Sequence, residues 1–244
     1  MHGLQRAISL LYPDQCMLCQ DLVSGDGGLC SDCWSGMSFV RGLACDCCGA
    51  PLYGVDDGPA HCDECIVTPK PWNKGRSVFL YRETGRSLIL KLKHGDRSDL
   101  AAPFSVWMEK AAAPILRSDT LIVPVPLHWR RLLKRRYNQS AELAAALARR
   151  TAAEYVPDAL TRSRFTRSQD GLDRRGRYAN LEDAIVPHRQ RGSVLAGRSV
   201  CLIDDVMTSG ATLSAATHAC YSAGAKRVSV LVLARVDRAP YISH

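Results

Sequence analysis

The chain has 244 residues, enough for one large domain or for a medium domain and a small one. It lacks the ~18 consecutive apolar residues that span a bilayer and the pattern of a signal peptide, which predicts a cytoplasmic protein with no membrane insertion. The net charge of +8 is uneven: residues 1–75 hold four Lys/Arg and nine Asp/Glu, and the remainder holds 28 basic and 15 acidic residues. This basic excess fits a polyanionic ligand, although a solvated surface has the same signature.

The N-terminal segment contains nine of the eleven cysteines, and eight of them form four Cys-x-x-Cys pairs. The pairs are Cys16 and Cys19, Cys30 and Cys33, Cys45 and Cys48, and Cys62 and Cys65. This spacing lets two thiolates bind one tetrahedral Zn²⁺. Without an export signal, it favours metal over a disulfide framework.

We therefore predict two structural Zn²⁺ sites of four cysteines each. Pairing of neighbouring Cys-x-x-Cys units is our choice because the intervening loops are short, although spacing also permits the first pair to join the third. Four thiolates leave no open position for a substrate, so the sites are expected to be structural. Few large apolar residues occur here, and metal binding would supply the folding free energy of a small domain over residues 1–70.

Residues 71–244 alternate apolar strands with amphipathic helices, after a proline-containing linker at 67–74. Strands are expected at 77–81, 121–126, 200–203 and 227–234, and helices at 85–94, 101–116, 140–150 and 213–223. This alternation predicts an α/β domain with a parallel sheet and helices on both of its faces.

Two basic segments lie between these elements. Arg130–Arg136 follows the strand that ends in prolines and could clamp a diphosphate, although a solvated helix face explains each arginine equally well. Asn138 is interpretable as a helix cap. The arginine-rich tract 160–180 predicts a loop that closes over an anionic ligand, with a disordered basic tract as the alternative.

The most specific motif follows the strand at 200–203. Asp204 and Asp205 stand at the end of this strand, and a turn of small and hydroxyl residues then leads into a helix. Ligands of open α/β sheets bind outside the carboxyl ends of the strands, and backbone N–H groups before a helix hold phosphate. Because the acidic pair can accept hydrogen bonds from vicinal sugar hydroxyls, the motif predicts a site for a ribose 5-phosphate. An ordinary strand with a capped turn is the alternative.

This motif resembles the phosphoribosyl diphosphate (PRPP) signature of type I phosphoribosyltransferases. With the cysteine pairs, Pro124–Leu127 and the Arg135–Gln139 motif, the chain from Cys16 to Arg235 resembles the ComF family of competence-associated proteins. Members pair an N-terminal double zinc ribbon with a phosphoribosyltransferase-like domain, here expected over residues 71–244. Arg136 departs from the family pattern, which has glycine at that position.

The resemblance implies that the protein binds PRPP together with Mg²⁺. It implies that Asp204 and Asp205 act as catalytic residues on the ribose hydroxyls, directly or through the metal, and that Lys93 and Arg135 stabilise the departing diphosphate. The rest of the expected PRPP-binding set is Val206, Met207, Thr208, Ser209, Gly210, Ala211 and Thr212.

The resemblance also links the chain to natural DNA uptake, with single-stranded DNA and proteins of the uptake machinery as expected partners. Two functions fit. One is a phosphoribosyltransferase, a kind of glycosyltransferase. The other is a non-catalytic, PRPP-sensing protein that binds single-stranded DNA, and it stays open because no motif identifies an acceptor base.

Overall fold

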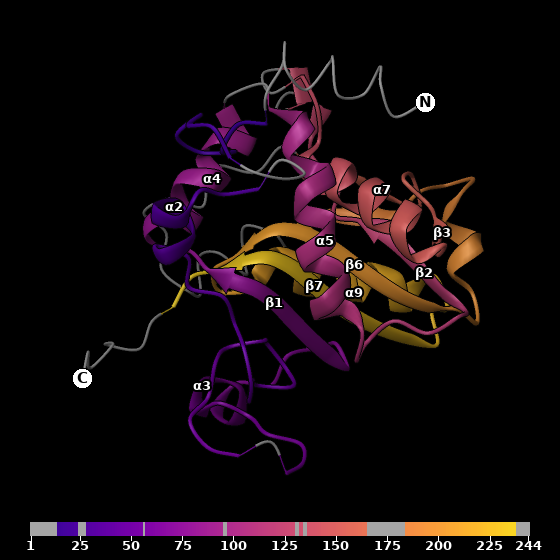
Figure 1. Cartoon of the computed structure of the whole chain (residues 1–244). Coiled ribbons are helices and arrows are strands. Elements are labelled where there is room, and N and C mark those ends of the chain that lie inside the picture. Colours follow the sequence, from indigo (N-terminus) through magenta and orange to yellow (C-terminus); the bar gives the residue numbers. More distant parts are fainter. Residues whose placement is uncertain are drawn as a thin grey trace.

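The computed structural model describes residues 14–23, 28–55, 57–94, 97–129, 132–133, 136–164 and 184–237. Five parallel strands form one sheet at the centre of the larger part of the chain (Figure 1). In order across the sheet they are β1 (Lys74–Leu80), β7 (Arg227–Arg235), β6 (Ser199–Met207), β2 (Thr120–Pro124) and β3 (Glu154–Tyr155). A separate antiparallel pair consists of β4 (Leu160–Arg162) and β5 (Ile185–Pro187). The predicted parallel sheet is confirmed.

Helices cover both faces of this sheet, as predicted. One face carries α4 (Glu83–His94), α5 (Ala101–Ala112) and α7 (Gln139–Thr151), and the other carries α9 (Ala211–Ser222). Two short 3-10 helices, η1 (Ser98–Leu100) and η2 (Gly192–Leu195), precede α5 and β6. Because alternate strand residues point to opposite faces, Ile203 packs under the three helices and Leu202 under α9. Within the part of the chain described here, no helix is both long and apolar enough to cross a membrane.

The central strand β6 is longer than expected. The predicted strand ends with the apolar run at Ile203, but β6 continues to Met207. Its extension stays in register with β7, where Asp204 lies opposite Val232 and Met207 lies opposite Arg235. The acidic pair therefore lies within the strand, and sheet hydrogen bonding holds its backbone.

Two helix starts are set by single residues. The side-chain oxygen of Asn138 accepts a hydrogen bond from the backbone N–H of Ser140 (3.1 Å) and caps α7, which confirms the interpretation as a cap. Gly210 precedes α9 with a φ of +80°, a left-handed conformation that glycine adopts without steric cost. This glycine makes the turn between β6 and α9 tight, so the first turn of α9 begins near the acidic pair.

The cysteine-rich segment packs on both faces of the sheet beside β1. Its first half, which includes α2 (Ser31–Ser35), packs through Met17 and Phe39 on the face of α4 and α5. Its second half, which includes α3 (Asp63–Val67), packs through Cys45 and Cys65 on the α9 face. Figure 1 shows α2 and α3 far apart, with β1 between them.

The second half of the expected linker at 67–74 is packed against the sheet, whereas Val67, at the end of α3, is exposed. Trp72 is 4% exposed, and the backbone N–H of Asn73 donates to the carbonyl oxygen of Val228 (2.8 Å). A Cβ atom at Gly75 would lie only 2.3 Å from the carbonyl oxygen of Cys47, so the backbones of ribbon and sheet are in direct contact. The ribbon and the sheet share buried side chains here, and the boundary at residue 70 remains a proposal from the sequence.

Candidate functional site

Side chains from two helices, α4 and α7, contact the acidic pair near the end of β6. Lys93 of α4 places its Nζ 3.3 Å from Oδ2 of Asp205. Ser140, in the first turn of α7, donates its hydroxyl to Oδ1 of Asp204 (2.8 Å). Tyr137 donates its hydroxyl to the carbonyl oxygen of Leu92 (2.6 Å) and so anchors the end of α4 next to Lys93. The sequence singled out Lys93, but not the supporting contacts of Ser140 and Tyr137.

The carboxyl group of Asp204 is under electrostatic strain. Burial and the neighbouring charge of Asp205 raise its pKa to about 7. Hydrogen bonds from Ser140 and from the backbone N–H of Asp205 (2.9 Å), together with Lys93, oppose this shift and favour the carboxylate. Such a pair gains most from a partner with donors or positive charge. Sugar hydroxyls are such a partner, and so is Mg²⁺, which prefers carboxylate ligands.

A small pocket lies where β6 ends and α9 begins. It is lined by Asp204, Val206, Met207, Thr208, Gly210, Ala211, Thr212 and Leu213. All of these except Leu213 belong to the set that the sequence predicts to bind PRPP. The first N–H groups of a helix have no partner within the helix and lie at the positive end of its dipole. The start of α9 therefore suits an anionic group such as phosphate.

Two residues from the expected linker contact this loop from the side of the ribbon. Lys70 donates its Nζ to the carbonyl oxygen of Ser209 (3.1 Å). The ring of Trp72 lies so close to Gly210 that a Cβ atom there would be 2.9 Å from its Cη2. Sequence reasoning missed both residues, because they lie in a segment that resembles a linker.

Several predicted ligands lie outside the described residues. They are Arg130, Arg131, Lys134 and Arg135 of the basic segment and residues 165–180 of the arginine-rich tract. Their roles stay predictions. Arg162, at the start of that tract, is described and is 6% exposed. It belongs to the interior of the protein rather than to an open anion-binding surface.

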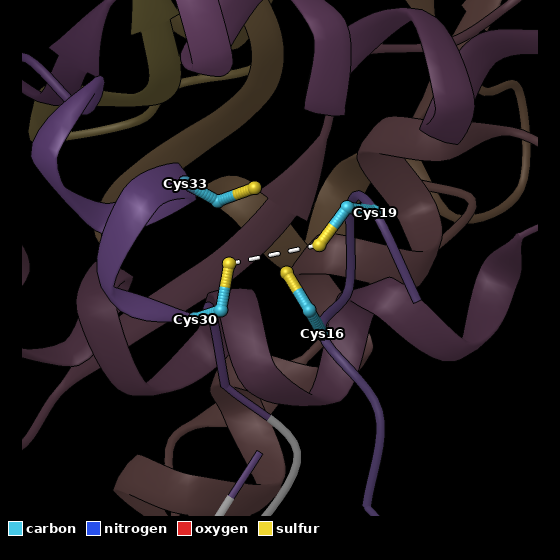
Figure 2. Close-up of side chains that lie close together, drawn as sticks. All are labelled: Cys16, Cys19, Cys30 and Cys33. Carbon is cyan, nitrogen blue, oxygen red and sulfur yellow. Dashed lines mark hydrogen bonds between the residues drawn. The ribbon is translucent and has the colours of Figure 1, made fainter. Parts of the chain in front are cut away.

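The eight paired cysteines form two tetrads. One contains Cys16, Cys19, Cys30 and Cys33, and the other contains Cys45, Cys48, Cys62 and Cys65. Within each tetrad the sulfur atoms lie within 4.8 Å of one another, and Figure 2 shows the first four facing a common centre. Pairing of neighbouring Cys-x-x-Cys units is thus confirmed.

The sulfur distances fit a tetrahedral Zn²⁺ site. Four sulfurs about 2.3 Å from a central zinc are about 3.8 Å apart. Cys19 and Cys30 have sulfurs 3.6 Å apart, as do Cys48 and Cys62. A disulfide would need about 2.05 Å. His61 is exposed and does not belong to either tetrad.

Solved structures of phosphoribosyltransferases are similar to the chain at a low level. Adenine phosphoribosyltransferase is 13% identical, with a TM-score of 0.36, and the match covers 62% of this chain and 76% of that one. Glutamine PRPP amidotransferase from B. subtilis is 17% identical with a TM-score of 0.39, over 64% of this chain and 32% of that one. These TM-scores are too low to establish the fold, so the α/β class is assigned from the parallel sheet of this chain.

Sequence relatives match almost the whole chain. DNA utilization protein YhgH of Escherichia coli (strain K12) is 32% identical over 93% of this chain and 99% of its own. Competence protein F of Haemophilus influenzae is 28% identical over 91% and 96%, and competence protein ComFC of Bacillus subtilis is 26% identical over 96% and 97%. The double zinc ribbon domain model matches residues 7–66, the segment that contains both tetrads. The chain has a double zinc ribbon, a parallel α/β domain and relatives that match it over almost their whole length. It therefore belongs to the ComF family.

Proposed function

We propose that the protein binds PRPP with Mg²⁺ in the pocket between β6 and α9. The observation that carries this proposal is the joint lining of the pocket by Asp204 and the loop before α9, with Lys93 ion-paired to Asp205 beside it. An acidic pair, a phosphate-binding turn and a cation are the three chemical features that a ribose carrying phosphate and diphosphate groups needs. The ion pair of Lys93 with Asp205 and the pocket shared by Asp204 and the loop support one common site for these features.

Each group of PRPP has a partner in this arrangement. The ribose hydroxyls would donate hydrogen bonds to Asp204 and Asp205. The 5-phosphate would accept from backbone N–H groups of the Thr208–Thr212 loop at the start of α9. Lys93 would lie near the diphosphate and favour its departure electrostatically. Arg135, which is assigned from the sequence alone, would have the same role. Mg²⁺ would supply positive charge for the diphosphate and the carboxylates.

The acidic pair also limits what can bind. Because the pKa of Asp204 is raised to about 7, two negative charges at this pair are unfavourable near neutral pH unless a positive group lies beside them. Otherwise the pair keeps a proton. Lys93 is such a group for Asp205 in the ligand-free protein. Binding of Mg²⁺ with PRPP would release the proton from Asp204, so affinity should increase with pH between about 6 and 8.

A non-catalytic, PRPP-sensing protein that binds single-stranded DNA is the second candidate. Its support is the naming of the relatives as DNA utilization and competence proteins, together with the basic excess after residue 75. In either case we propose a cytoplasmic protein linked to DNA uptake, with proteins of that machinery as partners. The two candidates differ in whether a group is transferred from PRPP.

Calorimetry with PRPP and Mg²⁺ tests the binding. The wild-type protein should bind, and the Asp204→Asn plus Asp205→Asn variant should bind at least tenfold more weakly, a loss of about 1.4 kcal/mol. Asp158→Asn is a matched control, since Asp158 pairs with Arg191 and its side chain is 51% exposed. Wild-type affinity in the double variant would remove the acidic pair from the site.

Release of diphosphate separates transfer from sensing. PRPP labelled in its diphosphate is incubated with the protein alone, with nitrogenous bases and with single-stranded DNA. Acceptor-dependent release supports the transferase. Tight binding without release under any of these conditions supports the sensor.

A further inference from the structure

Side-chain contacts connect the second zinc tetrad to the phosphate loop, Thr208–Thr212, which we propose holds the 5-phosphate. Lys70, whose side chain is 3% exposed, donates its Nζ to the carbonyl oxygen of Ser209 (3.1 Å) and ion-pairs with Glu64 (3.5 Å). Glu64 belongs to α3, the five-residue helix that also carries the ligand Cys65. Two side chains therefore connect a zinc-binding helix to the backbone of the loop.

A second path connects the tetrad to the neighbouring strand. Arg235, 6% exposed, lies at the end of β7 opposite Met207 of β6. Its guanidinium donates to the carbonyl oxygen of the ligand Cys48 (3.3 Å) and lies 3.6 Å from Glu64. Glu64 thus bridges two buried cations. Lys70 is directed at the loop, and Arg235 belongs to β7, the strand that pairs with β6.

Trp72 completes the contact. Its ring is packed against Gly210, and its indole N–H donates to the carbonyl oxygen of Cys47, which lies between two zinc ligands. The loop therefore rests on a surface whose shape depends on the fold of the second tetrad.

The contact with Lys70 sets the direction of a backbone donor. In a trans peptide the C=O and the following N–H point in opposite directions. A lysine that holds the carbonyl of Ser209 on the ribbon side turns the N–H of Gly210 away from the ribbon. Gly210 also lines the pocket, so in this proposal its N–H would face a phosphate bound there.

We propose that the second zinc site, through Lys70, positions the phosphate loop, so that PRPP affinity depends on zinc at Cys45, Cys48, Cys62 and Cys65. The proposal rests on the proposed PRPP function. A five-residue helix has little stability of its own, so metal binding fixes α3 and with it Glu64. The first half of the ribbon, which carries the first tetrad, packs against α4 and α5 on the other face of the sheet. Lys70 is a positioning residue in this proposal.

The binding test compares two lysines. Lys70→Met should weaken PRPP binding about tenfold in calorimetry, a change of about 1.4 kcal/mol, and Lys70→Arg should recover part of the loss. Lys74→Met is the matched control, because Lys74 lies four residues on, pairs with Asp46 of the ribbon (3.7 Å) and is 44% exposed. Affinity of Lys70→Met within twofold of wild type overturns the proposal, while wild-type binding itself upholds the PRPP function.

Hydrogen–deuterium exchange tests the same coupling without PRPP. In Lys70→Met, and in Cys62→Ser, which lacks a second-site ligand, the amides of residues 207–212 should exchange about tenfold faster than in wild type. Cys19→Ser removes a first-site ligand and should leave these amides unchanged. Loss of zinc from each variant is measured by native mass spectrometry.

If Cys62→Ser does not fold, stepwise chelation of the wild-type protein takes its place, with exchange measured on the species that has lost the second zinc. Unchanged exchange in that species overturns the proposal. Faster exchange in a protein that does not bind PRPP upholds the coupling and refutes the PRPP function instead. The two failures are therefore distinguishable.

Discussion

At Asp204, ligand binding and stability make opposite demands. Its pKa is raised to about 7 by burial and by Asp205, whereas an unfolded chain has an Asp pKa of about 4. The folded protein thus keeps a proton that the unfolded chain releases, and stability is lost as the pH rises from about 4 through 7. Asp204→Asn removes this loss, and we expect it to stabilise the ligand-free protein by about 1 kcal/mol more at pH 8 than at pH 6.

Chemical denaturation at both pH values measures this difference. The control is Asp158→Asn, in which a largely exposed carboxylate outside the site is removed. An equal effect of Asp204→Asn at the two pH values would show that its carboxyl does not titrate in this range.

Gly210 offers a second test at the scale of one residue. Its φ of +80° costs a residue with a Cβ about 1–2 kcal/mol, and the added Cβ would lie 2.9 Å from the ring of Trp72. Gly197 has a similar φ of +71°, but nothing lies within 4 Å of its Cβ position. Gly210→Ala should therefore lower the free energy of unfolding by about 1 kcal/mol more than Gly197→Ala.

Urea denaturation of the two glycine variants isolates the contact with Trp72, because the backbone cost is shared. Gly210→Ala should also weaken PRPP binding, and Gly197→Ala should not. Equal destabilisation by both substitutions would mean that the loop moves away from Trp72 at no cost.

At the scale of elements, an aromatic cluster attaches the first half of the ribbon to the sheet. Trp107 of α5 contacts Trp34 of α2, and its ring centroid lies 5.1 Å from Phe39 and 6.3 Å from Phe79 of β1. We expect Trp107→Ala to destabilise the protein by about 2–3 kcal/mol, because a partly buried aromatic side chain and several ring contacts are lost. Trp129→Ala is the control, since Trp129 is 57% exposed and should change stability by less than about 1 kcal/mol. The denaturation midpoints of the two variants are compared at saturating zinc. Equal midpoints would contradict this role of the cluster.

The elements differ in how well the sequence predicts them. The cysteine tetrads and the alternation of strands and helices follow from local spacing and from apolar runs, so both could be predicted. The extension of β6 through Asp204 could not be predicted. Two adjacent carboxylates do not favour a strand by themselves, and here the strand continues because Asp204 pairs with Val232 of β7. Lys70 and Trp72 were missed for the same reason: their burial depends on contacts with residues more than 130 positions away.

At the scale of the whole molecule, the charge asymmetry decides where nucleic acid should bind. Residues 1–75 are net acidic, and residues 128–191 contain 15 Lys/Arg and seven Asp/Glu. The structure refines this prediction, because Arg162 is buried and cannot serve as a surface contact, whereas Arg164 and Arg189 are exposed. If single-stranded DNA is a ligand, it should therefore bind to the sheet domain through exposed arginines of this kind.

A salt titration of single-stranded oligonucleotide binding checks this prediction. Each phosphate contact on a single strand contributes about −0.7 to the slope of log affinity against log salt concentration. Arg164→Glu plus Arg189→Glu should therefore flatten the slope by about 1.4 and weaken binding of all sequences alike, because phosphate contacts carry no base specificity. Arg41→Glu, an exposed charge reversal on the ribbon, should leave the slope unchanged. If Arg41→Glu flattened the slope and the sheet-domain variant did not, the ribbon would be the DNA-binding element despite its acidic composition.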